Sequence, residues 1–166
     1  MRLMSLRIAL SILATLGAQA AAQNVAASGS SESTRVVFVC EHGSVKSLVA
    51  MAYFNRRAQV RGIPNRAFAR GTAPEPNVPG PVREGLRRDG FDVSKFAPHL
   101  FEASDLDGAL LVVSFDQDVA KTVGGRTRHL SWDKLPGVLS DYESGRNEIV
   151  RHIDELIDEL ARGAAP

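Results

Sequence analysis

Short apolar runs in the sequence predict the strands of a sheet. Residues 36–39 (Val-Val-Phe-Val) and residues 109–115 are apolar almost throughout, which is typical of strands buried on both faces in a parallel sheet. Alternation over residues 66–70 predicts a further strand, and residues 127–132 are a candidate for one more. We therefore expect a sheet of about four strands.

Helical spacing of apolar residues fills the intervals between these strands. The first helix is expected from Ser47 to Arg61, because Gly62 is a natural C-terminal cap and Pro64 cannot continue a helix. Shorter helices are expected over residues 82–88 and from Asp116 to the glycine pair at 124–125. The last helix has the clearest apolar stripe, with charged residues opposite: Ile149, Val150, Ile153, Leu156, Ile157 and Leu160.

This alternation of strands and helices predicts the fold class. Parallel strands joined by helices form α/β folds that carry helices on both faces of the sheet. We expect an α/β three-layer sandwich with a short parallel sheet, in one domain over residues 35–163. Residues 71–81 are rich in proline and are expected to be a loop, and the sequence shows neither an internal repeat nor a second domain.

The N-terminal residues have the pattern of an export signal. Arg2 and Arg7 precede an apolar run over residues 8–18, and the small residues at 18–22 fit a signal-peptidase site. The run is shorter than the roughly 20 residues that a membrane-spanning helix needs. We expect a signal peptide at residues 1–22 and a flexible lead-in at 23–34, so the mature protein is expected to be periplasmic or secreted, and not membrane-bound.

Composition narrows the classes of function. The 166 residues include 20 Lys and Arg and 19 Asp and Glu, so we do not expect a nucleic-acid-binding protein. The single cysteine, Cys40, excludes an internal disulfide, a multi-cysteine zinc site and any redox cycle that needs a second cysteine in the chain. The four histidines show no metal-ligand spacing, and we expect neither a metal nor another cofactor.

The chemically informative segment is residues 40–47, Cys-Glu-His-Gly-Ser-Val-Lys-Ser. It lies between a buried strand and a helix, where α/β sheets bind ligands, and amides at a helix N-terminus hold anions and favour a thiolate. We expect Cys40 to be the nucleophile and Lys46 a catalytic positive charge. The expected oxyanion cradle is His42, Gly43, Ser44, Val45 and Ser47. On pattern alone, Cys40 is equally a small buried hydrophobic residue.

Residues 40–47 resemble the Cys-x5-Arg-Ser/Thr loop of low-molecular-weight protein tyrosine phosphatases, whose fold is shared by thioredoxin-coupled arsenate reductases. The resemblance continues in residues 70–72, 82–94 and 110–116, and it runs in collinear order from about residue 35 to residue 162. It implies a phosphatase-I-like fold and a thiophosphate intermediate on Cys40.

The loop departs from the family pattern at several positions. Lys46 replaces the arginine that holds a phosphoryl group through two parallel hydrogen bonds. Gly43 replaces an asparagine, Val45 replaces the second cysteine of many members, and Glu41 puts an anion beside an anion site. The extra cysteines of the arsenate reductases are absent, which excludes their intramolecular disulfide cascade.

The resemblance also implies a general acid, which in the family belongs to an Asp-Pro pair that this sequence lacks. Asp133 is the nearest candidate and Asp141 the second. Asp133 is equally a surface turn residue that pairs with Lys134. Asp116 is expected to cap the helix that follows its strand.

Three functions remain open at this point. The first is an exported phosphatase-like hydrolase that acts on aryl phosphates or phosphotyrosine proteins and binds phosphate. The second is an oxyanion-binding module with negligible turnover, which is favoured by Lys46, Glu41 and the missing Asp-Pro pair. The third is an arsenate reductase that uses an external thiol.

Overall fold

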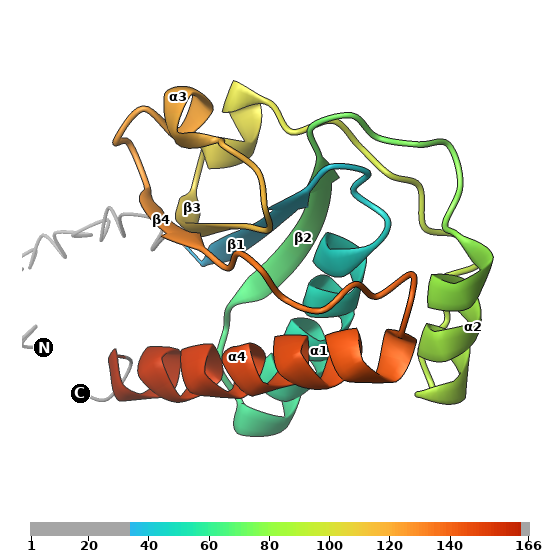
Figure 1. Cartoon of the computed structure of the whole chain (residues 1–166). Helices are drawn as coiled ribbons and strands as arrows, with labels where there is room; N and C mark the ends of the chain where they lie inside the picture. Colours follow the sequence, from blue (N-terminus) through green and yellow to red (C-terminus); the bar gives the residue numbers. More distant parts are fainter. Residues whose placement is uncertain (1–33, 164–166) are drawn as a thin grey trace, which may run out of the picture. The chain divides into compact units, whose positions relative to one another are not determined.

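The computed structural model describes residues 34–163 (Figure 1). The predicted signal peptide at 1–22 and all but the last residue of the predicted lead-in at 23–34 lie outside the described residues. Within them, no helix combines the length and the apolar character that crossing a membrane requires.

A four-stranded parallel sheet forms the centre of the fold. Its strands are β1 (Arg35–Cys40), β2 (Arg66–Gly71), β3 (Ala109–Ser114) and β4 (Arg128–Ser131), in the spatial order β2-β1-β3-β4. The two central strands, β1 and β3, correspond to the apolar runs at residues 36–39 and 109–115. Their interior positions are almost fully buried. The α/β class and the parallel sheet expected from the sequence are confirmed.

Helices cover both faces of this sheet. On one face, a large core cluster joins Val36 and Phe38 of β1 to α1 (Lys46–Arg61), α2 (Gly80–Arg88) and α4 (Tyr142–Gly163). On the other face, a smaller cluster joins Val37 and Val39 to the short helices η1 (Ala103–Leu106) and α3 (Ala120–Val123). Figure 1 shows α1 and α4 side by side below the sheet and α3 above it.

The starts of α1 and α2 lie within two residues of the prediction, whereas those of α3 and α4 differ more. Helix α3 begins at Ala120, because Asp116 has a φ of 52°, which a right-handed helix does not allow, and the Asp118 carboxylate accepts the Ala120 N–H. The expectation that Asp116 caps this helix is therefore wrong. Helix α4 begins at Tyr142, ahead of its predicted apolar stripe, and the Asp141 carboxylate accepts an N–H of its first turn, that of Ser144.

A polar network fixes α1, α2 and α4 at one end of the larger core. The Asp89 carboxylate accepts the hydroxyl groups of Tyr53 and Tyr142, each at 2.7 Å. Burial and the hydrogen bond to Asp89 both raise the pKa of Tyr142, so this phenol stays protonated. A Cβ atom on Gly85 would lie 2.4 Å from the Tyr142 ring, so a glycine is needed for the ring to reach Asp89.

Candidate active site

The segment between β1 and α1 is shaped by two glycines that touch. Gly43 has a φ of +70°, and a Cβ atom on it would lie 2.8 Å from the Gly71 nitrogen at the end of β2. The same strand end continues into residues whose amides hold the segment, because Thr72 donates to the Cys40 carbonyl and Ala73 to the Glu41 carbonyl, at 3.0 and 2.8 Å. Gly71 and Thr72 belong to the segment at 70–72 that resembles the family. Their structural role is therefore to hold the loop between β1 and α1 in place.

The amides of this loop are available to a ligand. The carbonyls of Cys40 and Glu41 are bonded, but among the described residues no hydrogen bond is donated by the backbone N–H of residues 41–45. The Ser44 side chain is fully buried and its Oγ also has no partner in the described part of the protein. Since buried polar groups are normally paired and a helix N-terminus attracts anions, this loop is suited to an oxyanion.

Cys40 lies at the end of β1 and is 5% exposed. Its Sγ is 3.1 Å from the Oγ of Ser47, in the first turn of α1, so that hydroxyl can donate to a thiolate. A cavity of about 160 Å³ opens at Cys40 and is also lined by Glu41, His42, Val45, Lys46, Phe115, Asp116 and Gln117. Of the predicted cradle residues, His42 and Val45 therefore line the cavity with Cys40, and Ser47 lies beside its sulfur.

Lys46 is held by the protein rather than left free. Its side chain is 15% exposed, and its Nζ donates to Asp116 Oδ2 at 2.6 Å and to the Leu135 carbonyl at 3.1 Å. Partial burial acts to raise the pKa of Asp116, but hydrogen bonds from Lys46 and from the Lys134 amide, with the charge of Lys46, outweigh it and lower that pKa. Lys46 lines the Cys40 cavity, and its positive charge is thus already matched by a carboxylate.

Asp133, the predicted general acid, is bonded to Asp116 and does not line the Cys40 cavity. Its carboxylate accepts the Asp116 backbone N–H at 3.0 Å and the Ser131 hydroxyl at 2.7 Å, and it lines a neighbouring cavity rather than the one at Cys40. Asp141 caps α4. Sequence reasoning missed Asp116 as a site residue, although Cys40 ends one buried strand, Asp116 comes just after another, and parallel neighbours end at the same sheet edge.

A family model described as "Low molecular weight phosphotyrosine protein phosphatase" matches residues 35–161. The chain belongs to this family. No curated protein sequence matches the chain.

Solved structures share the fold of this chain. A YwlE mutant from Bacillus subtilis is 18% identical with a TM-score of 0.68, covering 76% of this chain and 98% of that one. A low molecular weight protein tyrosine phosphatase from T. tengcongensis is 22% identical with a TM-score of 0.64, covering 76% and 99%. A thioredoxin-dependent arsenate reductase from Corynebacterium glutamicum is 22% identical with a TM-score of 0.61, covering 78% and 62%.

Family membership confirms the resemblance seen in the sequence and supports a phosphatase-like hydrolase. The roles of the individual site residues stay predictions. Within residues 34–163, no group of three or more His, Cys, Asp or Glu side chains is arranged to hold a metal ion.

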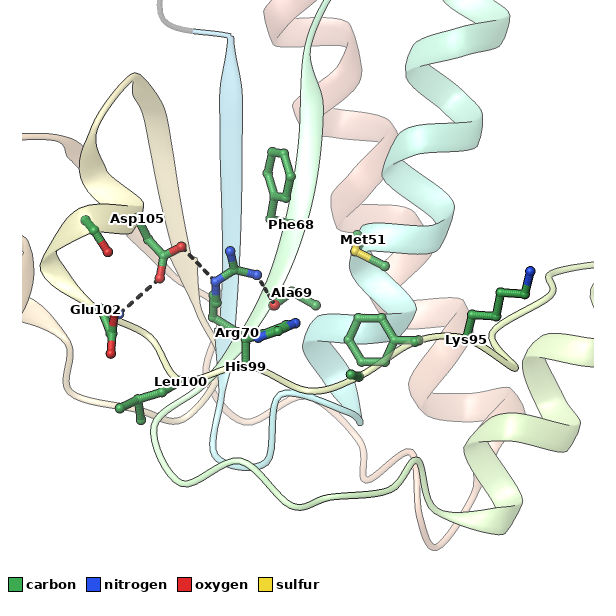
Figure 2. A pocket seen from close by; sticks show the side chains of 12 residues that line it. Met51, Phe68, Ala69, Arg70, Lys95, His99, Leu100, Glu102 and Asp105 are labelled. Carbon is green, nitrogen blue, oxygen red and sulfur yellow. Dashed lines mark hydrogen bonds and ion pairs between the residues drawn. The ribbon is translucent and has the colours of Figure 1, made fainter.

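A larger cavity lies elsewhere, at the outer edge of β2, with a volume of about 720 Å³ (Figure 2). None of the described residues that line it is a cysteine. Its arginine, Arg70, donates to the Asp105 carboxylate at 2.7 Å and to the Ala69 carbonyl at 2.9 Å, so its charge is already satisfied. Size does not identify the candidate active site here, since the smaller cavity holds Cys40 and the unpaired amides.

Proposed function

We propose that the protein is an exported phosphatase that hydrolyses aryl phosphates, phosphotyrosine among them, through a thiophosphate intermediate on Cys40. The observation that carries the proposal is the set of unpaired loop amides beside Cys40, in the described part of the chain, at the start of α1. Family membership supports it. Export rests on the sequence pattern of residues 1–22.

The first step transfers the phosphoryl group to sulfur. The Cys40 thiolate attacks phosphorus, the S–P bond forms, and the bond to the aryl oxygen breaks with its electron pair going to that oxygen. The loop amides and Ser47 stabilise the charge on the equatorial oxygens and on the thiolate. The departing oxygen takes a proton from a carboxylic acid.

We assign this acid to Asp116 because its side chain lines the Cys40 cavity. Asp133 then acts as a positioning residue, because its carboxylate holds the Asp116 backbone. In the second step water attacks phosphorus, Asp116 accepts the proton of the water, and the S–P electron pair returns to sulfur as phosphate leaves. Since the pKa of Asp116 is lowered, its acidic form is scarce at neutral pH, and slow turnover is expected there.

Two structural neighbours support oxyanion binding by this fold. One is described as a YwlE arginine phosphatase, a mutant with a phosphorylated active-site serine, and another as an arsenate reductase in the phosphate-binding state. The phosphoryl-binding property is proposed for this chain by analogy.

The second candidate is an oxyanion-binding module without useful turnover. It is favoured by one observation, the pairing of Lys46 with Asp116 at 2.6 Å, which reduces the positive charge offered to a transition state. An arsenate reductase that uses an external thiol is disfavoured by the predicted export, because that chemistry needs a supply of reductant.

Hydrolysis of 4-nitrophenyl phosphate by the wild type and by Cys40→Ser tests the proposal. We expect turnover in the wild type only, and a phosphoryl group on Cys40 in acid-quenched protein. Asp116→Asn should accumulate this intermediate more than Asp133→Asn does. Wild-type turnover no faster than that of Cys40→Ser contradicts the phosphatase, and retained vanadate binding would then identify the binding module.

Export is tested separately. N-terminal sequencing of protein from the periplasm or the medium should begin between residues 21 and 23. A cytoplasmic protein that keeps Met1 contradicts this part of the proposal and leaves the phosphatase reaction unaffected.

A further inference from the structure

The cavity at Cys40 is bordered by more negative than positive charge. Glu41 and Asp116 line it, and Glu75 lies 3.4 Å from the ring of His42, whose other nitrogen is 3.8 Å from Glu41. Of the Lys and Arg residues in the described part of the chain, one, Lys46, lines this cavity, and Asp116 already pairs with it. A phosphate dianion therefore meets attractive amides inside the cavity and repulsive carboxylates at its border.

The neighbouring cavity continues this negative border. It has a volume of about 400 Å³ and shares Asp116 and Gln117 with the Cys40 cavity. Asp118 and Asp133 add two carboxylates, and no Lys or Arg among residues 34–163 lines it. The hydrogen-bond donors to Asp118 and Asp133 within these residues are backbone amides and the Ser131 hydroxyl, so their negative charge is not neutralised there by a bonded cation.

We infer that this site selects phosphorylated segments that carry Lys or Arg beside the phosphorylated residue, and that Glu41 and Glu75 are residues that determine this specificity. The inference rests on the proposed phosphatase function. The physical reason is charge complementarity, because a basic neighbour offsets the repulsion between the phosphoryl group and the border, whereas an acidic neighbour adds to it. Successive residues of an extended chain are about 3.3 Å apart, so neighbouring side chains reach this border.

Three phosphotyrosine peptides of equal length, with Lys, Ser or Glu on both sides of the phosphotyrosine, provide the test. We expect kcat/KM of the full-length protein to fall in the order Lys, Ser, Glu at low salt. The ratio between the Lys and Glu peptides should shrink as salt screens exposed charges. Glu41→Gln and Glu75→Gln should each lower this ratio by about two- to fivefold, the range of a single exposed charge pair.

The matched control is Glu155→Gln, an exposed carboxylate on α4 that lines neither cavity, and it should leave the ratio unchanged. Equal rates for the three peptides with Cys40-dependent turnover contradict the inference alone. A ratio that does not respond to Glu41→Gln or Glu75→Gln also contradicts it. No turnover of any peptide above the rate of Cys40→Ser contradicts the proposed function itself, so the two failures are distinguishable.

Discussion

Replacing Asp116 by asparagine should tighten oxyanion binding while it lowers turnover. In the structure Lys46 Nζ donates to Asp116 Oδ2 at 2.6 Å, and the Asp116 side chain is 44% exposed. Solvent screens such a pair, so its loss should cost at most about 1 kcal/mol of folding free energy. The released ammonium can instead donate to an oxyanion, and a hydrogen bond between charged groups contributes about 1.5–3 kcal/mol.

Lys46 also donates to the Leu135 carbonyl, which opposes its movement, so we expect a net gain of about 1–2 kcal/mol in binding free energy. This corresponds to roughly five- to thirtyfold tighter binding of vanadate or phosphate, measurable by titration calorimetry. Turnover should fall in the same variant because the proposed proton donor is lost. Opposite changes in affinity and rate are a signature that simple damage to the fold does not produce.

Asp118→Asn is the matched control, because it removes the same charge from the neighbouring cavity, and Asp118 forms neither of the two hydrogen bonds that hold Lys46. Adding Lys46→Met to Asp116→Asn should abolish the gain. The reasoning is refuted if Asp116→Asn leaves the affinity unchanged or weakens it. An equal gain in Asp118→Asn refutes it too, since a general charge effect would then explain the result.

Further substitutions test the loop and the packing of the helices. Lys46→Arg should raise kcat/KM for 4-nitrophenyl phosphate by about tenfold to a hundredfold, because a guanidinium can bond two equatorial oxygens. An unchanged or lower value argues against the prediction that Lys46 is a catalytic positive charge. Gly43→Ala should destabilise the protein by roughly 1–3 kcal/mol and weaken phosphate binding, because its φ is +70° and its Cβ would meet the backbone at 2.8 Å. Gly85→Ala should also lower the denaturation midpoint, although Ala favours helix, because its Cβ would lie 2.4 Å from the Tyr142 ring. For both glycine variants Gly80→Ala is the control, since its Cβ would meet nothing within 4 Å, and a loss of stability no larger than in this control would be evidence against the packing argument.

The sheet was predictable from the sequence because strands buried on both faces consist almost entirely of apolar residues. Strands β1 and β3 are each an unbroken apolar run, and no tertiary information is needed to recognise them.

The start of α4 was not predictable in this way. Its first turns contain Gly145 and Asn147, which are poor helix formers. A glycine is needed at position 145 because a Cβ atom there would lie 2.9 Å from Val138. The sequence does not reveal this contact.

In the site, too, the local part was predictable from the sequence and the long-range part was not. Cys40, the loop and the start of α1 are consecutive in the chain, so their proximity followed from the strand–loop–helix pattern. The pairing of Lys46 with Asp116 joins residues 70 positions apart. It depends on β1 and β3 being neighbours and on the φ of 52° at Asp116, and neither property is written in the local residue pattern. The family resemblance directed the search for the general acid to the segment that follows β4, and Asp116, which lines the Cys40 cavity, was assigned to a helix cap.

The pairing has a larger cost for a lysine, which stands here where the family has arginine. An arginine has five N–H donors, so it can bond a carboxylate and still present a fork to a phosphoryl group. A lysine has three donors, and here two are used by Asp116 and Leu135. Oxyanion binding must then depend mainly on the loop amides, whose geometry is fixed by Gly43 and Gly71 rather than by a cation. A site of this kind binds anions less tightly, and charges on the neighbouring residues of the substrate have a correspondingly larger share in deciding which phosphoryl groups it accepts.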